Sequence, residues 1–425
     1  MEDNKRVNKK VDYINRIFAV IIILSFCIVF AQRTFRHSRD ILGSVGDSIG
    51  RFSKSEDRLS QRSFNLYMDI YGNLRGGITY FFSYPPRELL FTHAHFEYLK
   101  LTGRGHFNDI TFLKDGRHML DRMKYKTYFD ERANSILGLN NYLADKGTPF
   151  LYVRVPNKLH DNSLLPAAYS DNRMIENGNT LLGLVSDAGV DTYDIRAEMM
   201  RENFDFVTGF YRRHMHWTNK TVLWASQKVG GLMNREYGFN IDLGIWDLDK
   251  YEQVTYEKVL LGNEAFPVGA YYDLETITLL YPAFPVELDK ADSNHNFHID
   301  SSNNFVELFL PNIYRGDLTH FECHDIRIPG AHFTHLVNHE ATEDKRILLI
   351  SDSYSLSWAM YLPMGIKNLD FVYLINYRTP AEIWDFIEDK HYDLAILAVS
   401  DVVVSTENAA YFEADRLNLG IPPQR

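Results

Sequence analysis

The sequence predicts an α/β protein built on a doubly wound parallel sheet, with a mostly β insertion and one N-terminal membrane segment. Three observations lead to this prediction. Short, almost wholly apolar runs alternate with helical patterns, as buried parallel strands and their crossover helices do. Residues 240–342 instead contain alternating runs without clear helices. A charge-free apolar segment, residues 17–31, precedes both regions.

Length and composition limit the classes of protein to consider. The chain has 425 residues, enough for one large or two ordinary domains, and its 45% hydrophobic residues can bury a core. The formal net charge is −11, and no basic run occurs beyond the first residues, which argues against nucleic acid as a partner. Cys323 is the only cysteine after the apolar segment, so no disulfide is expected within the part that follows it.

The first 75 residues are distinct from the rest. Residues 1–16 form a net-positive leader. The fifteen apolar residues that follow fall short of a bilayer core of roughly 30 Å unless flanking residues are drawn in, and this length also suits a signal peptide. We favour an uncleaved single-pass anchor with a cytoplasmic leader. Residues 32–75 are polar and are expected to form a stalk.

Residues 76–239 are expected to form the first part of the α/β domain. KDGRHML (114–120) is typical of a turn between two short strands. Further along, apolar periodicity followed by glycine predicts helices, and β-branched or aromatic runs predict strands. These elements are a helix over 130–147, a strand over 149–156, a helix over 179–189 and a strand over 190–195.

The second part of the domain is expected over residues 343–425. Buried strands are predicted at KRILLIS (345–351), DFVYLI (370–375) and DLAILAV (393–399), with helices after the first and second. Within the insertion, TITLLY (276–281) and FVELFL (305–310) are interpreted as strands.

Ser353 is a candidate nucleophile because of its place in this pattern. It lies two residues after the strand RILLIS and just before a helix, where catalytic groups gather in open parallel sheets. The following N–H groups can support developing negative charge. The alternative is that Ser351, Asp352 or Ser353 only caps the helix.

A serine nucleophile needs a base, and YRRHMHW (211–217) offers two histidines. Strand-like alternation would place His214 and His216 on one face, with Met215 on the other. His216 is the natural base, with Trp217 packing behind it. The rival histidines are His93, His95 and His160.

Three motifs resemble the SGNH-hydrolase-like proteins of bacterial polysaccharide O-acetylation, the alginate acetyltransferase group and especially the DHHW protein family. They are VPNK (155–158), HMHW (214–217) and SDSYS (351–355). The resemblance implies an SGNH-like fold with Ser353 as nucleophile and His216 as general base. The family's acid aligns with His214, which we expect neither to fix the tautomer of His216 nor to offset its charge as a carboxylate does.

Two carboxylates are candidates to replace the missing acid, Asp205 and Asp352, of which Asp352 is expected to be occupied by the turn. The oxyanion donors would be the backbone N–H of Ser353 and a second group, for which Asn157 and Arg378 lie at the expected sheet edge.

Metal and cofactor chemistry are weaker alternatives. His332, His335 and His339, with the H-x-H pair, resemble a zinc ligand set, but no H-E-x-x-H motif occurs and a loop is the favoured interpretation. No P-loop or G-x-G-x-x-G is present, so no cofactor is expected.

The function expected from the resemblance is O-acetylation of a cell-surface polysaccharide through an acetyl-serine. It implies a membrane-bound O-acyltransferase as the acetyl source and an extracytoplasmic C-terminal domain on a cell-membrane anchor. A carbohydrate esterase would use the same residues with water as acceptor. The other alternative is a non-catalytic binding or scaffold protein on a decayed hydrolase fold, suggested by the altered acid position.

Overall fold

The computed structural model describes residues 106–107, 110–114, 118–121, 129–165, 173–260, 262, 264, 274–314, 328, 331–374 and 380–405. All of them belong to one unit, Leu99–Arg425. The predicted leader, apolar segment and stalk lie outside these residues, as do His93, His95 and Arg378. Within the described part of the chain, no helix is both long and apolar enough to cross a bilayer.

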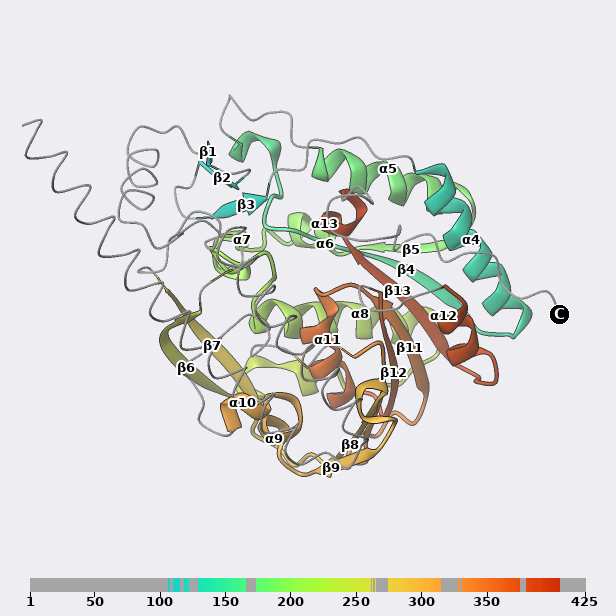
Figure 1. Ribbon diagram of the computed structural model, residues 1–425. Coiled ribbons are helices and arrows are strands. Elements are labelled where there is room, and N and C mark those ends of the chain that lie inside the picture. The colour runs from blue at the N-terminus through green and yellow to red at the C-terminus, as the bar shows by residue number, and fades with distance from the viewer. Residues whose placement is uncertain are drawn as a thin grey trace, which may run out of the picture. The chain divides into compact units, whose positions relative to one another are not determined.

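An eight-stranded sheet forms the centre of the domain, in the order β5-β4-β13-β11-β12-β10-β8-β9 (Figure 1). The first five strands in this order pair in parallel: β5 (Asp191–Asp194), β4 (Phe150–Val155), β13 (Leu394–Ser400), β11 (Arg346–Ser351) and β12 (Asn368–Tyr373). The last three pair antiparallel: β10 (Phe333–Asn338), β8 (Leu288–Asp292) and β9 (Ile299–Ser302). The α/β class is confirmed, but the prediction of a wholly parallel sheet is wrong.

Two smaller sheets accompany the main one. A three-stranded sheet contains β1 (His106–Phe107), β2 (Ile110–Phe112) and β3 (Met119–Asp121), and a two-stranded ribbon contains β6 (Tyr251–Leu260) and β7 (Glu275–Pro282). β2 and β3 pair antiparallel on either side of the predicted turn at 114–120. The ribbon includes the predicted strand TITLLY.

Helices cover both faces of the main sheet. On one face, α4 (Asp130–Asp145), α5 (Met174–Asp187), α12 (Pro380–Ile387) and α13 (Asp401–Ser405) share a core with side chains of the parallel strands. On the other face, α6 (Ile195–Arg201), α8 (Asn219–Glu236) and α11 (Ser355–Tyr361) share a second, larger core. The remaining α-helices of the described residues are α7 (Phe206–Gly209), α9 (Phe305–Phe309) and α10 (Pro311–Tyr314). Figure 1 shows α4, α5 and α12 grouped on one side of β4 and β13.

The two cores explain why the strand predictions were reliable. Every residue of β4 and β13 is buried, since alternate side chains enter opposite cores. Phe150 and Tyr152 face α4 and α5, while Leu151 and Val153 face the α8 side. A strand buried on both faces has to be apolar throughout, which is the pattern in the sequence. In the same way, Gly147 (φ 72°) follows the C-terminal end of α4, where the glycine stop was predicted.

The predicted insertion, residues 240–342, differs most from expectation. Its strands β8, β9 and β10 do not form a separate β unit but extend the main sheet. FVELFL is not a strand, because Asn304 caps a helix there and accepts hydrogen bonds from the N–H groups of Val306 (3.0 Å) and Glu307 (3.2 Å). In that helix, Phe305, Leu308 and Phe309 are buried together, which is the three- and four-residue spacing of a helix face and not the two-residue alternation of a strand.

A buried ion pair joins the carboxyl ends of β4 and β13. The guanidinium of Arg154 donates to both carboxylate oxygens of Asp401, from Nε at 2.7 Å and from Nη2 at 3.0 Å. Both side chains are fully buried. Such a bidentate pair holds two strand ends at fixed positions, and these strand ends flank the candidate site described below.

Gly178→Ala is expected to destabilise the fold by about 3 kcal/mol, within the range for overpacking or disrupting a buried ion pair. A Cβ at Gly178, on α5, would lie 2.1 Å from Oδ1 of Asp401 and 2.5 Å from Nη2 of Arg154. The measurement is the free energy of unfolding in urea. Gly183→Ala on the same helix is the control, because nothing lies within 4 Å of its added Cβ. That variant should be roughly 0.5–1 kcal/mol more stable, and equal effects of both changes would contradict the prediction.

Candidate active site

Ser353 lies on the turn between β11 and α11, and buried polar contacts fix that turn. Asp352 accepts hydrogen bonds from the N–H groups of Tyr354 (2.9 Å) and Ser400 (2.8 Å), so its carboxylate ties the turn to the end of β13. The hydroxyl of Ser351 donates to the carbonyl of Ala398 at 2.5 Å. Ser351 and Asp352 are fully buried, whereas Ser353 is partly exposed. The turn therefore presents one serine hydroxyl and uses its neighbours as supports.

The imidazole of His216 lies against this hydroxyl. Its Nε2 is 2.9 Å from Oγ of Ser353, although the two residues are 137 positions apart in the chain. His216 is buried and belongs to a loop that is closed by a single bridge between Phe210 and Trp217. This separation is a hydrogen-bonding distance and matches that of a nucleophile and its general base.

His214 occupies the position next to the other ring nitrogen of His216. The two Nδ1 atoms are 3.0 Å apart, and the rings are stacked with centroids 4.6 Å apart. The backbone N–H of His216 also points to Nδ1 of His214, at 3.4 Å. A backbone N–H can only donate, so Nδ1 of His214 is the acceptor. Nδ1 of His216 then carries the proton, and its Nε2 is left to accept the proton of Ser353.

This geometry corrects one expectation and leaves another unchanged. We expected that an imidazole at position 214 cannot fix the tautomer of His216, but a neutral His214 does so through its Nδ1 lone pair. A neutral ring does not offset the positive charge that His216 acquires when it takes a proton. The strand-like alternation predicted for this stretch is also wrong, because residues 212–216 form a series of bends; the two rings are adjacent through stacking instead.

Tyr354 supports the loop of residues 210–217, which carries His216 and is called the base loop from here on. Its ring packs against that of His216, with centroids 4.6 Å apart, and its hydroxyl donates to the carbonyl of Met215. Burial and the carboxylates of Glu264 and Asp352 raise the pKa of Tyr354, which keeps this hydroxyl protonated. Trp217, only 1% exposed, donates from Nε1 to the carbonyl of Tyr354 at 3.0 Å. The turn that carries the nucleophile and the loop that carries the base are thus joined directly.

Comparisons with known proteins agree with this arrangement. Residues 116–242 match the family described as "SGNH hydrolase-like domain, acetyltransferase AlgX". This match and the sheet topology support an SGNH-like α/β fold for the chain. The matched segment includes His214 and His216 and ends before Ser353, which the fold brings to it. The comparison with curated proteins finds no match.

Solved structures share the SGNH-like fold at low sequence identity. PatB1 of Bacillus cereus, solved with a sulfonyl adduct, has a TM-score of 0.55 and 12% identity, covering 72% of this chain and 98% of that one. A DHHW family protein from Eubacterium siraeum has a TM-score of 0.52 and 14% identity, covering 75% of this chain and 98% of that one. These values establish a common fold.

The SGNH-like domain uses Asn157 as an internal support. This side chain, predicted as an oxyanion donor, is fully buried. Its Nδ2 donates to the hydroxyl of Tyr354 at 2.8 Å, and its Oδ1 accepts from the N–H of Leu159 at 3.0 Å. The contacts join the end of β4 to the nucleophile turn. The other predicted donor, Arg378, lies outside the described residues.

The carboxylates proposed to replace the family acid have other partners. Asp205 accepts from the N–H of Val207 (3.0 Å) and the hydroxyl of Thr208 (2.7 Å) at the start of α7, and these hydrogen bonds lower its pKa. Asp352 is engaged within the turn, as described above. Position 214 therefore supplies the hydrogen-bond acceptor for Nδ1 of His216.

Two acidic residues that hold the base loop were not singled out from the sequence. Glu275, on β7, accepts from the backbone N–H groups of Arg212 (2.6 Å) and Arg213 (3.1 Å). Glu264 forms a buried ion pair with Lys158, the lysine of the VPNK motif. Lys158 also donates to the carbonyl of Arg212 at 3.4 Å. Lys158 belongs to a motif that was recognised in the sequence, but no sequence pattern around Glu264 identified it as the partner of Lys158.

The remaining candidate histidines of the SGNH-like domain are engaged elsewhere. His160 stacks on Phe206 with centroids 3.9 Å apart, and burial lowers its pKa. His335 and His339 pair with Asp370 (2.5 Å) and Asp289 (2.8 Å), respectively. Among the described residues, no group of three or more histidine, cysteine or acidic side chains could hold a metal ion.

Proposed function

We propose that this protein is an O-acetyltransferase that acts on a cell-surface polysaccharide through an acetyl group on Ser353. The observation that carries the proposal is the hydrogen-bonded series from Oγ of Ser353 through His216 to His214, with distances of 2.9 Å and 3.0 Å. The match to an acetyltransferase domain supports this choice of reaction class.

In the first half of the reaction, Oγ of Ser353 attacks the carbonyl carbon of an acetyl ester. Its proton moves to Nε2 of His216 while Nδ1 of His216 donates to His214. The backbone N–H of Ser353 is the proposed donor to the oxyanion. When the tetrahedral intermediate collapses, the ester oxygen of the acetyl donor leaves with the proton from His216, and acetyl-Ser353 remains.

In the second half, a sugar hydroxyl attacks the acetyl-serine. His216 accepts the hydroxyl proton at Nε2 and returns it to Oγ of Ser353 as the new ester leaves. Asn157 acts through Tyr354, by holding the turn and the loop in register, and does not contact the reacting atoms. Arg378 remains a proposed contributor to substrate binding.

The proposed cellular setting follows from the first 75 residues. A basic leader and an apolar segment would anchor the chain in the cell membrane with the domain outside the cytoplasm. The acetyl source would then be a membrane-bound O-acyltransferase, which passes acetyl groups across the bilayer to Ser353.

The test is the mass of the full-length chain after incubation with 4-nitrophenyl acetate, followed by a chase with either buffer or an oligosaccharide. We expect one acetyl group on the protein, which the sugar removes faster than water while the sugar gains an ester. Equal loss in buffer and sugar, with free acetate as product, would establish the esterase. No adduct, also with a sulfonyl fluoride as a second serine reagent, would favour the non-catalytic scaffold.

A further inference from the structure

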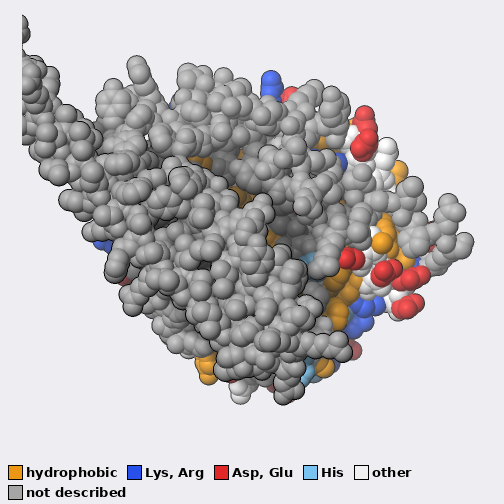
Figure 2. All heavy atoms as spheres, viewed as in Figure 1, with side chains coloured by type: hydrophobic (Ala, Val, Ile, Leu, Met, Phe, Trp, Pro, Cys, Tyr) orange, Lys and Arg blue, Asp and Glu red, His pale blue; other side chains and the backbone are white. Residues whose placement is uncertain are grey.

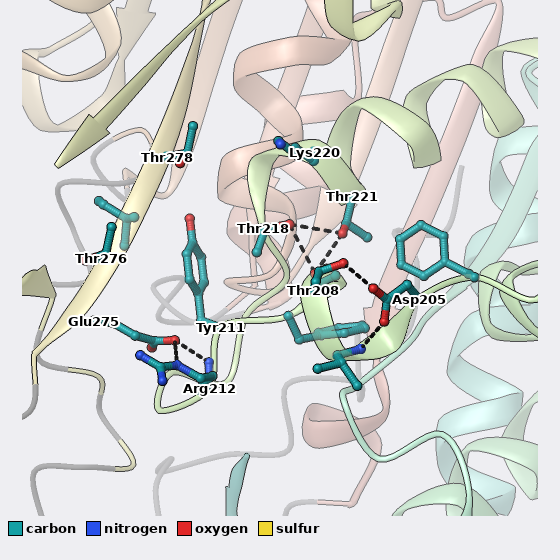
Figure 3. A pocket seen from close by; sticks show the side chains of 15 residues that line it. Asp205, Thr208, Tyr211, Arg212, Thr218, Lys220, Thr221, Glu275, Thr276 and Thr278 are labelled. Atoms are coloured by element: carbon teal, nitrogen blue, oxygen red, sulfur yellow. Dashed lines mark hydrogen bonds and ion pairs between the residues drawn. The ribbon is translucent and has the colours of Figure 1, made fainter. Parts of the chain in front are cut away.

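A cavity borders residues 210–212 of the base loop. Its volume is about 700 Å³, within the roughly 300–1,000 Å³ typical of small-molecule sites. It is lined by α7, the start of α8, β7 and residues 210–212 of the loop that carries His214 and His216 (Figure 3). Ser353 and His216 themselves are not part of the lining. The cavity is therefore separate from the catalytic pair but shares a wall with it.

Hydroxyl groups dominate the polar lining. Five threonines from three elements face the cavity: Thr208, Thr218, Thr221, Thr276 and Thr278. Each is oriented by an internal hydrogen bond, such as that from Thr221 to the carbonyl of Gly209 (2.7 Å) or that between Thr278 and Thr255 (3.1 Å). A hydroxyl oxygen with one such bond keeps a lone pair for a further donor. The wall thus offers fixed acceptors for a ligand rich in hydroxyl groups.

Tyr211 adds a polar group that is not hydrogen-bonded by the part of the chain that the structure describes. Its side chain is 4% exposed, and its hydroxyl has no hydrogen-bond partner within the described part of the chain. Figure 3 shows this hydroxyl directed between Thr278 on β7 and Thr218 at the start of α8. A buried polar group without a partner requires an explanation, and a ligand in this cavity would provide the partner.

The charged residues that line the cavity indicate which classes of ligand it favours. Arg212 is paired with Glu275 at 3.3 Å, and Asp205 adds a carboxylate, so only Lys220 contributes a cation without an ion-pair partner among the described residues. A highly charged phosphate ligand would meet both carboxylates. Phe204, Phe210 and Ile277 supply apolar surface, as the C–H faces of a sugar ring require.

We propose that this cavity binds a saccharide unit of the glycan that accepts the acetyl group. This inference rests on the proposed function, since it assigns the acceptor its own binding site. Tyr211 connects the two sites: its ring lies edge-on to that of His214, with centroids 6.1 Å apart, and its N–H donates to the carbonyl of His216 at 3.2 Å. A glycan held here lies beside the loop that carries the base.

Binding is tested by NMR titration of the full-length Ser353→Ala chain, which cannot turn over, with cellotriose, chitotriose and trigalacturonate. At least one trisaccharide should bind with a millimolar Kd. Tyr211→Phe should weaken that binding about three- to tenfold, the value of one hydrogen bond. Tyr251→Phe is the matched control, because its buried hydroxyl also lacks a partner among the described residues but is not part of the cavity lining.

Lys220→Gln keeps the tests informative if Tyr211→Phe fails to fold, because Lys220 is exposed. It should weaken the binding of trigalacturonate if the glycan is acidic. If the glycan is neutral, it should weaken the binding of the neutral trisaccharide that the cavity accepts. Absence of binding by all three sugars would overturn the proposal, and so would binding that neither cavity variant changes. Neither result bears on acetylation of Ser353, which is measured separately on the wild type.

Discussion

Replacing Ser353 by alanine should remove acetyl labelling completely and lower turnover of 4-nitrophenyl acetate by at least about two orders of magnitude, the part of the full triad loss that remains when the acid is already absent. The reason is geometric: Oγ of Ser353 is the atom that Nε2 of His216 contacts at 2.9 Å. Removing Oγ takes away the nucleophile, while the supports of the turn, Ser351 and Asp352, are unchanged.

Ser355→Ala is the matched control for this loss. Ser355 lies two residues further along, is fully buried and hydrogen-bonds to Ser351 at 2.6 Å. Because Ser351 keeps its bond to Ala398, the turn should persist and labelling should continue. Labelling that survives Ser353→Ala, or that disappears only in Ser355→Ala, would show that Ser353 is not the nucleophile.

Among variants at position 214, the rate of adduct formation should be highest with aspartate. The wild-type histidine and asparagine should give similar, lower rates, and leucine should give the lowest rate. An aspartate accepts a hydrogen bond from the Nδ1–H of His216 and also offsets its charge, so the rate should rise, with the roughly four orders of magnitude lost by the reverse change of acid to amide as the upper limit. Asparagine keeps only an acceptor oxygen, and leucine keeps neither. A leucine variant as fast as the wild type would mean that the 3.0 Å contact has no role.

The sequence predicted best what depends on local pattern. β4, β11 and β13 were recognised because strands buried on both faces must be apolar, and Ser353 because it follows such a strand. His216 was singled out by its neighbours and by family resemblance. These features depend on a few consecutive residues.

What could not be predicted depends on partners that are distant in sequence. Tyr354 reaches Met215, and Glu275 reaches Arg212, only after folding has brought β7, β11 and the base loop together. The antiparallel edge was also missed, since β10 alternates between buried and half-buried residues as a strand of a separate β unit would. The capacity of His214 to accept a hydrogen bond depends on ring orientation, which sequence does not encode locally.

On the face of the molecule that Figure 2 shows, the charges of the described residues do not indicate a class of partner. The coloured side chains there include acidic, basic and hydrophobic ones close together, with no continuous basic area among the described residues in view. Recognition of a glycan is therefore expected to depend on hydroxyl and aromatic contacts in a cavity, and to respond little to salt.

The position of β13 in the sheet has a consequence for biogenesis. It is the last strand in sequence among those described, yet it lies between β4 and β11 and supplies the N–H of Ser400 that holds the turn of Ser353. While the chain emerges from a ribosome or a translocation channel, β4 and β11 cannot yet share their common neighbour. Ser353 therefore takes its observed geometry only after residue 400 has been delivered, so incomplete or stalled chains would lack the contact between Ser353 and His216.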